Sequence, residues 1–189
     1  MEIKKIVVAS GNAGKIKEIK SIFSSYEIAS MKDLGFCEEV EETGVTFKEN
    51  AYIKAKAVAL ALNLPTLSDD SGLCVDALDG APGVFSARFS GKGDKGNREL
   101  LLKKLEGDEN RSAYFESCVC LYLPDGTAIF GEGKTFGKIM HEESGTNGFG
   151  YDCIFYSNDL QKGFGEASDQ EKNAVSHRYR ALCDLRNKL

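Results

Sequence analysis

Residues 6–15 have the sequence IVVASGNAGK, and the residues beyond them place Ile16, Ile19 and Phe23 at helical spacing. The apolar run at residues 6–9 predicts a buried strand, the two glycines predict a tight turn, and the spaced apolar side chains predict a helix. This strand–turn–helix unit indicates an α/β fold, because such units pack their helices against a central sheet.

The turn between this strand and this helix, Ser10–Lys15, is a candidate phosphate site. Backbone N–H groups, the positive end of a helix dipole and a lysine can converge there on a phosphate. The segment is not a Walker A loop, because only Asn12 and Ala13 separate Gly11 from Gly14, where that motif requires four residues. An ordinary glycine turn is the alternative interpretation of this segment.

Local patterns further along the chain predict the remaining strands and helices. A capping box of Thr46 and Glu49 predicts a helix over residues 46–62. A second capping box, Ser168 with Glu171, predicts a terminal helical region in which a second helix begins at Ser176. The patterns also predict a short strand at residues 64–68 that ends at Asp69-Asp70, with extended chain again at residues 73–77. They further predict a glycine-rich loop at residues 79–96, a helix that ends before Gly107, a hairpin at residues 114–131 and a strand at residues 153–156. The hairpin makes the predicted sheet mixed.

Two groups of acidic residues could supply oxygen ligands for a hard divalent cation, namely residues 38–42 and the pair Asp69-Asp70. Mg²⁺ takes one or two protein carboxylates and completes its shell with water and substrate phosphate, so one acid from each group suffices, and we choose Glu42 and Asp70. In an extended chain Asp69 and Asp70 project to opposite sides, so at most one of them reaches the metal. A solvated acidic turn is the alternative interpretation of residues 38–41.

An aromatic residue between glycines, Phe149, is a candidate for stacking on a nucleotide base, because a glycine backbone can bring the ring flat against a planar ligand. Asp152 could accept hydrogen bonds from ring nitrogens. Donors that suit the oxo groups of a keto-purine better than the amino group of adenine lie in or beside the terminal helical region, and these are Lys172, Ser176, His177 and Arg178. The alternative interpretation makes Phe149 a core anchor.

Length and composition restrict the class of protein. The chain of 189 residues has 42% hydrophobic and 28% charged residues, which predicts a single globular domain over residues 1–189. A net charge of −5 without a dense run of Lys or Arg argues against a nucleic-acid partner. No apolar stretch approaches the ~20 residues of a membrane helix and the amino terminus has no leader pattern, so we expect no membrane partner and a cytoplasmic location. The six cysteines form no C-x-x-C pair and are expected to be reduced.

Six motifs, taken in order, resemble those of the inosine/xanthosine triphosphate pyrophosphatase family. They are Ser10–Lys15, Glu41–Ala51, Asp69–Gly72, Gly80–Gly83 with Ser86–Phe89, Gly148–Asp152, and Glu171-Lys172 followed by Ser176–Arg178. Six ordered motifs at compatible spacing are far more specific than any one of them. The resemblance implies an elongated α/β fold with a central mixed sheet flanked by helices, two lobes around a substrate cleft, and a homodimer.

The resemblance also implies Mg²⁺-dependent hydrolysis of purine nucleoside triphosphates such as ITP, dITP and XTP, between the α and β phosphates. Residue by residue, it implies phosphate binding by Ser10, Gly11, Asn12, Ala13, Gly14, Lys15 and Lys54, and metal binding by Glu42 and Asp70. It further implies proton acceptance by Asp70, a substrate contact by Ser71, and a base pocket of Phe149, Gly150, Tyr151, Asp152, Lys172, His177 and Arg178. Asp69 is the alternative base.

Two other functions fit part of the sequence. A Mg²⁺-dependent phosphomonoesterase would use a strand-end aspartate as nucleophile, but it usually wants a second acid two residues later, and Asp69-Asp70-Ser71 lacks that spacing. A non-catalytic nucleotide-binding module would bind the same nucleotides without turnover. Release of orthophosphate would favour the first function, and tight binding without any product would favour the second.

Overall fold

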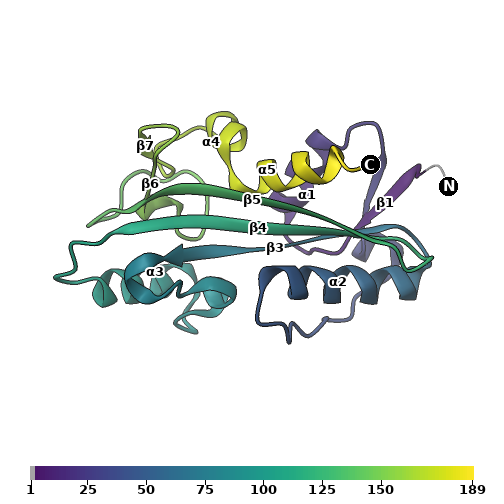
Figure 1. Ribbon diagram of the computed structural model, residues 1–189, viewed down its shortest axis with the longest axis horizontal. Coiled ribbons are helices and arrows are strands. Elements are labelled where there is room, and N and C mark those ends of the chain that lie inside the picture. The colour runs from purple at the N-terminus through teal and green to yellow at the C-terminus, as the bar shows by residue number, and fades with distance from the viewer. Residues whose placement is uncertain (1–2) are drawn as a thin grey trace. The chain divides into compact units, whose positions relative to one another are not determined.

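The computed structural model describes residues 3–189, and within them it contains a seven-stranded sheet flanked by helices (Figure 1). The strands are β1 (Lys5–Val8), β2 (Glu27–Ser30), β3 (Thr66–Val75), β4 (Ser112–Tyr122), β5 (Ala128–Ile139), β6 (Phe155–Ser157) and β7 (Lys162–Gly163). The α-helices are α1 (Ala13–Ile22), α2 (Phe47–Leu62), α3 (Gly93–Lys104), α4 (Asp169–Val175) and α5 (His177–Arg186). Short 3₁₀ helices are η1 (Lys32–Leu34), η2 (Asp76–Leu78), η3 (Gly83–Arg88) and η4 (Asp152–Ile154).

The strand order in the sheet is β2-β1-β3-β4-β5-β6-β7. Strand β1 runs parallel to both β2 and β3, with Val8 opposite Ser30 on one side and Leu67 on the other. Strand β6 runs antiparallel to β5 and to β7. The predicted α/β fold with a mixed sheet is therefore confirmed.

The chain divides into two compact units. Unit 1 contains the residues up to Asp70 together with residues 117–133 and 178–189, and unit 2 contains residues 71–116 and 134–177. Strands β3, β4 and β5 contribute residues to both units. Each unit has its own buried apolar core, so the two units are described in turn.

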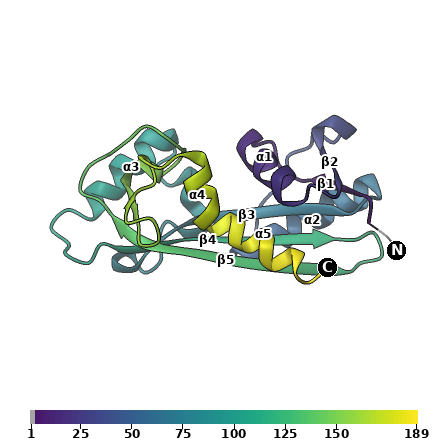
Figure 2. The ribbon, with the colours of Figure 1, turned by 90° about the horizontal axis from the view of Figure 1, so that it is seen from above.

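Unit 1 places α2 on one face of its strands and α1 and α5 on the other (Figures 1 and 2). The alternation of side chains along β1 supplies both faces, because Ile6 and Val8 join the cluster that includes α1 and α5, whereas Val7 joins Val58 of α2. The capping box of Thr46 and Glu49 forms as predicted and starts α2. The predicted first strand, turn and helix are confirmed as well.

Unit 2 is built around a cluster of aromatic rings. Phe115, Phe155 and Phe164 are buried together, with ring centroids 4.7 Å apart for Phe115 and Phe155 and 5.1 Å apart for Phe155 and Phe164. Leu101 of α3 is buried in the same cluster. The second predicted capping box is also present and starts α4, which ends at Ser176, immediately before α5.

The prediction that a short strand ends at Asp69-Asp70 was wrong. Strand β3 continues from Thr66 to Val75, so both aspartates lie inside it. The polar residues remain in the strand because the fold satisfies them there: Ser68 Oγ donates a hydrogen bond to the Ala51 carbonyl, and both carboxylates meet buried cations.

Two further predictions of local structure need correction. The predicted glycine-rich loop at residues 79–96 contains η3 and the first residues of α3, because the Asn97 amide donates to the Ser86 and Ala87 carbonyls and stabilises a local helical turn. The strand predicted at residues 153–156 begins only at Phe155, after η4. Strand β2 was not predicted, since its sequence EIAS shows neither an apolar run nor a clear alternation.

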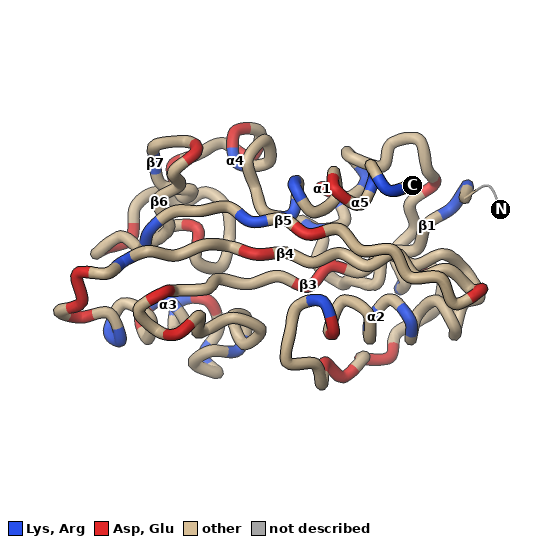
Figure 3. Tube along the Cα trace, in the orientation of Figure 1, with Lys and Arg blue, Asp and Glu red and all other residues tan. Residues whose placement is uncertain are grey.

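Charged residues of both signs are distributed along the part of the chain that the structure describes. Figure 3 shows Lys and Arg interspersed with Asp and Glu along both units. None of the helices between residues 3 and 189 combines the length and the apolar character needed to cross a bilayer.

Candidate active site

The predicted phosphate-binding turn, Ser10–Lys15, leads into the amino terminus of α1. Asn12 is the N-cap, and its side chain accepts a hydrogen bond of 3.1 Å from the Lys15 amide. Residues 11–14 are exposed, and the first turn of α1 contains no acidic residue. The Asn12 amide donates a hydrogen bond of 3.1 Å to Ser10 Oγ, whereas the amides of Gly11, Ala13 and Gly14 and the positive helix end are accessible to an anion.

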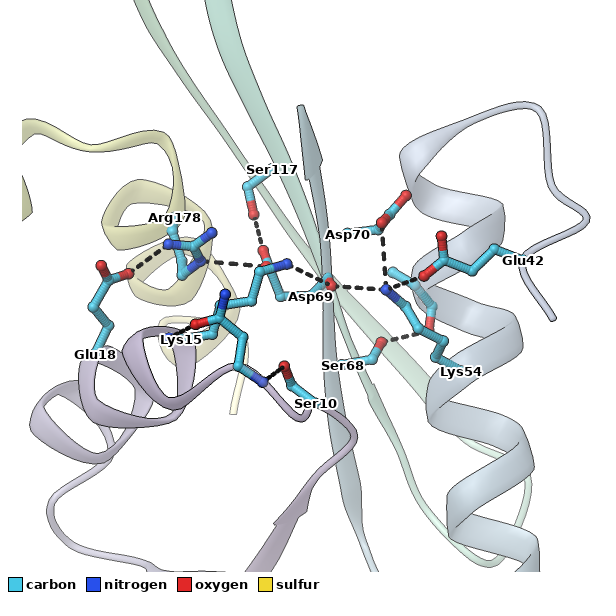
Figure 4. A network of polar contacts seen from close by, with 12 residues as sticks. Ser10, Lys15, Glu18, Glu42, Lys54, Ser68, Asp69, Asp70, Ser117 and Arg178 are labelled. Atoms are coloured by element: carbon cyan, nitrogen blue, oxygen red, sulfur yellow. Dashed lines mark hydrogen bonds and ion pairs between the residues drawn. The ribbon is translucent and has the colours of Figure 1, made fainter. Parts of the chain in front are cut away.

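Asp69 is the centre of a buried ion network in unit 1. Its Oδ2 lies 2.6 Å from Lys15 Nζ and 3.2 Å from Arg178 Nε, and its Oδ1 accepts a hydrogen bond of 2.5 Å from Ser117 Oγ. Arg178 also pairs with Glu18 of α1 at 2.8 Å. Figure 4 shows this network on one side of β3, where α1 and α5 meet the strand.

The charges around Asp69 favour its ionised form. Burial raises the pKa of the Asp69 carboxyl, but the positive charges of Lys15 and Arg178 outweigh burial and hold this pKa well below its usual value. Both oxygens are engaged, and the side chain is only 1% exposed. Asp69 is therefore a poor proton acceptor.

Asp70 lies on the opposite side of β3, facing α2 (Figure 4). Lys54 Nζ is 3.3 Å from Asp70 Oδ1 and 2.8 Å from Glu42 Oε1, so the two carboxylates converge on one cationic group. Burial alone would lower the pKa of Lys54, yet Asp70 and Glu42 raise it above its usual value, and the ammonium is charged at neutral pH. Lys54 also donates to the Asp69 carbonyl at 3.0 Å.

Asp70, unlike Asp69, has a carboxylate oxygen that can still accept a hydrogen bond or bind a cation. Its Oδ2 is buried and has no hydrogen-bond partner among the described residues. Burial raises the pKa of Asp70 above its usual value, and the charge of Lys54 offsets only part of that effect. A buried carboxylate oxygen without a partner is costly, which indicates a ligand or a water there during function.

The residues around Asp70 fit a hard divalent cation. Two carboxylates, Glu42 and Asp70, already converge on a positive charge, and one of their oxygens is uncommitted. Among residues 3–189 no group of three or more metal-ligating side chains occurs. Two carboxylates are enough for an ion such as Mg²⁺, because it uses one or two protein carboxylates and takes its other ligands from water and phosphate.

The segment that carries Glu42 is held against α2. The Gly44 amide donates a hydrogen bond of 2.8 Å to Asn50 Oδ1. A Cβ atom at Gly44 would stand 2.7 Å from that same oxygen, so only glycine permits this close approach. The capping box of Thr46 and Glu49 then fixes the chain at the start of the helix. The prediction of a solvated turn therefore does not extend to Glu42, whose side chain is 25% exposed.

The predicted base-binding residues Phe149, Asp152 and Lys172 gather in unit 2. Lys172 Nζ lies 2.5 Å from Asp152 Oδ2 and 4.5 Å from the centroid of the Phe149 ring. The Phe149 amide donates to the same carboxylate oxygen at 2.8 Å. Phe149 is 47% exposed, while Asp152 and Lys172 are buried. Phe149 is thus no core anchor, and its ring is accessible to a planar ligand.

Other predicted base-pocket residues have structural contacts. The Tyr151 hydroxyl donates to the Ser86 carbonyl at 2.8 Å, which anchors the loop. The buried His177 ring stacks on Phe115 with centroids 4.9 Å apart. Arg178 belongs to unit 1 and pairs there with Asp69 and Glu18.

Two further predicted substrate contacts are Gly150, in the loop beside Phe149, and Ser71, directly after Asp70. Gly150 adopts a positive φ of +61°, a conformation that favours glycine. Ser71 is partly buried in β3. Both residues belong to unit 2.

Sequence reasoning missed two members of the Asp69 network, Glu18 and Ser117. Glu18 stands three residues after Lys15, so helical spacing places both on one face of α1 and could have indicated it. Ser117 lies within a strand-forming run and carries no local signal. Its role follows only from the pairing of β3 with β4.

Comparisons with known proteins agree with this fold. A sequence model of the Ham1 family matches residues 6–188. A dITP/XTP pyrophosphatase of Desulfotalea psychrophila is 46% identical over 188 residues, which cover 97% of this chain and 84% of that protein. The Staphylococcus aureus Ham1 protein structure is similar, with a TM-score of 0.90 and 41% identity over 98% of this chain and 100% of that chain.

A HAM1 protein from Coxiella burnetii is also similar in structure, with a TM-score of 0.91 and 40% identity over 98% of each chain. Relatives at this identity and coverage share both the fold and the family. The resemblance drawn from the six sequence motifs is confirmed by these matches. The chain therefore belongs to the Ham1 family.

Proposed function

We propose that this protein hydrolyses the non-canonical purine nucleotides ITP, dITP and XTP to the monophosphate and pyrophosphate, which removes them from the nucleotide pool. Relatives that match nearly the whole chain are named dITP/XTP pyrophosphatases. The observation that carries the proposal is the meeting, on strand β3, of an accessible helix terminus, two lysines and two carboxylates; the side chains are Lys15, Lys54, Glu42 and Asp70.

In this proposal the residues of the first turn bind the triphosphate. The exposed amides of Gly11, Ala13 and Gly14 and the Ser10 hydroxyl donate hydrogen bonds to phosphate oxygens, while the Asn12 amide donates to Ser10 Oγ and orients it. Lys15 and Lys54 add positive charge, which stabilises the pyrophosphate as it leaves. Both lysines are already oriented by aspartates of β3, so little side-chain entropy is lost when phosphate binds.

Glu42 and Asp70 are the residues that would hold Mg²⁺. When bound, the ion neutralises charge on the phosphate oxygens. Lys54, which contacts both carboxylates, would lie beside the ion and add its own positive charge to the site.

Asp70 is the proposed catalytic residue, which orients the attacking water and accepts its proton. Asp69 is the weaker candidate, because its carboxylate is fully paired and its pKa is held low. Asp70 has an uncommitted oxygen and a raised pKa, which both favour proton acceptance. Attack on the α phosphorus with pyrophosphate as leaving group completes the reaction.

The residues Phe149, Asp152 and Lys172 are the proposed contacts for the base. The half-exposed ring of Phe149 would stack on a purine, and the Lys172 ammonium would donate to the 6-oxo group of inosine or xanthine. Adenine presents an amino group at that position, which leaves the buried donor without an acceptor. Such a mismatch discriminates strongly between substrates.

We also propose that both units act as one catalytic domain over residues 1–189, that the protein is a homodimer, and that it works in the cytoplasm. The first proposal rests on the three strands shared by the units, and the other two on the family resemblance. Light scattering after size-exclusion chromatography tests the dimer directly: a mass near 41 kDa is expected, against 20.6 kDa for one chain.

The proposed activity is tested by product analysis. The purified protein is incubated with Mg²⁺ and, in separate reactions, with dITP, XTP, ATP and GTP, and the products are separated by anion exchange. We expect monophosphate and pyrophosphate from dITP and XTP, with ATP left intact. An Asp70→Asn preparation, purified in parallel, measures any contaminating phosphatase.

Each other outcome identifies a different function. Orthophosphate as the product would indicate a phosphomonoesterase and would contradict the proposal. Binding of dITP without any product would indicate a nucleotide-binding module. Equal turnover of dITP and ATP would retain the pyrophosphatase chemistry but remove the proposed role of Lys172 in selectivity.

A further inference from the structure

The base-binding loop of unit 2 is held by two side chains from α3 whose function neither the sequence motifs nor the proposed mechanism explains. Asp94 Oδ2 accepts a hydrogen bond of 3.1 Å from the Gly150 amide. Arg98 Nη1 donates a hydrogen bond of 2.9 Å to the Gly150 carbonyl. The residue next to Phe149 thus has both of its backbone polar groups bound by one helix.

Arg98 is itself fixed in place. Its Nε donates to Glu143 Oε1 at 2.7 Å, and its side chain is only 16% exposed. Asp94 and Arg98 are four residues apart, so they project from the same face of α3 toward the loop. Two charged side chains therefore make hydrogen bonds to the backbone of a single glycine, one to its amide and one to its carbonyl.

The same loop is restrained on the other side of Phe149. The Phe149 amide donates to Asp152 Oδ2 at 2.8 Å, and Gly148 adopts a φ of +77°. A Cβ atom at Gly148 would overlap the Asp152 carboxylate, so this tight turn requires glycine. The chain is therefore fixed immediately before and immediately after Phe149.

Asn97 of α3 is linked to the loop indirectly, through the Ser86 carbonyl. Its amide donates to the Ser86 carbonyl at 3.2 Å, and the Tyr151 hydroxyl donates to that same carbonyl at 2.8 Å. Asn97 Oδ1 in turn accepts a hydrogen bond of 2.7 Å from the Ser90 amide. Helix α3 thus organises the backbone on which the half-exposed Phe149 ring is presented.

We propose that Asp94 and Arg98 are positioning residues for the purine base. By binding the amide and the carbonyl of Gly150, they hold the Phe149 ring in the orientation in which it stacks on the base beside Lys172. They touch neither the phosphates nor the attacking water. The inference rests on the proposed function, because it assumes that the ligand stacked on Phe149 is a purine.

The test compares steady-state kinetics of Asp94→Ala and Arg98→Ala with those of the unmodified protein, using dITP and ATP. Each variant loses one hydrogen bond to the loop, so we expect KM for dITP to rise about three- to tenfold. The kcat value should stay within about twofold, because contacts to the base are made equally in the ground and transition states. Selectivity for dITP over ATP should fall.

Two controls separate positioning from stability. Asp94→Asn keeps an acceptor oxygen for the Gly150 amide and should restore a KM close to that of the unmodified protein. Arg111 donates to three backbone carbonyls elsewhere in unit 2, those of Leu105, Ile139 and Met140. Arg111→Ala should therefore lower the free energy of unfolding without changing KM or selectivity.

A second readout is independent of activity. The chain contains no tryptophan, so a Phe149→Trp variant carries a single indole at the ring position. When Asp94→Ala or Arg98→Ala is added to this variant, the fluorescence anisotropy of the indole should fall and its quenching by acrylamide should increase. Arg111→Ala should change neither quantity.

Two results would overturn the inference. One is an unchanged KM and unchanged anisotropy in both alanine variants, and the other is an equal rise of KM in Arg111→Ala. Failure of the proposed function is recognised separately, because the unmodified protein would then release no pyrophosphate from dITP. The anisotropy measurement would still decide whether Asp94 and Arg98 hold the ring.

Discussion

Asp69 and Asp70 are adjacent in β3, yet their carboxylates enter opposite environments: Asp69 Oδ2 is 2.6 Å from Lys15, and Asp70 Oδ1 is 3.3 Å from Lys54. The alternation of side chains along a strand produces this separation. Asp69 has no uncommitted oxygen, whereas Asp70 Oδ2 lacks a partner among the described residues. Consecutive residues of β3 thus have different roles: Asp69 stabilises the fold through its ion pairs, and Asp70 is the proposed proton acceptor.

We expect Asp70→Asn to lower kcat by about a thousandfold, because the amide cannot accept the proton of water. The substitution keeps the shape of the side chain, so dITP should still bind. Pyrophosphate release measures turnover, and isothermal titration calorimetry measures binding. Asp76→Asn, at an exposed position soon after the site, is the matched control and should have normal kinetics. A nearly normal kcat in Asp70→Asn would refute the assignment of the catalytic residue.

Asp69→Asn should instead destabilise the fold. Breaking a buried ion pair from one side costs about 3–5 kcal/mol, and we expect about 3 kcal/mol because Arg178 keeps its contact with Glu18. Urea denaturation at pH 7 measures this loss. If Asp69→Asn unfolds like the unmodified protein but has no activity, Asp69 belongs to the chemistry and the division of roles is wrong.

The same pair predicts how stability depends on pH. The pKa of Asp69 is depressed in the folded protein, while the unfolded chain has a value near ~3.9. A depressed carboxyl pKa stabilises the fold above the unfolded pKa, and this contribution is lost as pH falls below about 4. The difference in unfolding free energy between the unmodified protein and Asp69→Asn should therefore shrink between pH 5 and pH 3. A constant difference over that range would contradict the depressed pKa.

The elements with strong local signals could be predicted from the sequence. The first strand, turn and helix follow from apolar spacing, and the two capping boxes define the starts of α2 and α4. Strand β3 could not be bounded correctly, because its polar centre is stable only with cations brought from α1, α2 and α5. Strand propensity is judged from residues that are close in sequence, whereas the cations that stabilise Asp69 and Asp70 come from distant parts of the chain.

The residues of the candidate site that lie in sequence motifs could be predicted, whereas those held by distant parts of the chain could not. Glu42, Lys54 and Asp70 were chosen from separate motifs, and the structure brings their side chains into contact. The place of Arg178 was not predictable, because helix α5 begins at the residue before it and its side chain enters unit 1. Asp94 and Arg98 were missed for a related reason, as their partners are backbone groups of Gly150 that carry no sequence signal.

The cysteines give a prediction that is independent of the nucleotide. Burial raises the pKa of the Cys118 and Cys120 thiols to about 12, whereas Cys37 is exposed. Because the thiolate is the reactive form, an aromatic disulfide reagent at pH 8 should label Cys37 rapidly and the two strand cysteines only after unfolding. Peptide mapping of the labelled protein checks this order. Rapid labelling of Cys120 in the folded protein would mean that β4 is accessible.

Metal dependence is tested through Glu42. If Glu42 and Asp70 hold Mg²⁺, chelation should abolish turnover and added Mg²⁺ should restore it. Glu42→Gln removes one negative ligand, so the Mg²⁺ concentration for half-maximal activity should rise at least about tenfold, with most activity recovered at saturation. Glu39→Gln, at an exposed position of the same acidic segment, should leave this concentration unchanged.

The result for Glu42→Gln distinguishes two roles of the same carboxylate. Glu42 contacts Lys54 at 2.8 Å, so it could act by orienting the lysine instead of binding the metal. Loss of a lysine-orienting contact would raise KM for dITP at every Mg²⁺ concentration, whereas loss of a metal ligand is overcome by more Mg²⁺. A titration of Mg²⁺ at fixed dITP, followed by a titration of dITP at saturating Mg²⁺, separates these cases. Lys54→Gln removes the lysine that contacts both Glu42 and Asp70. It should raise KM for dITP and leave the Mg²⁺ concentration for half-maximal activity unchanged.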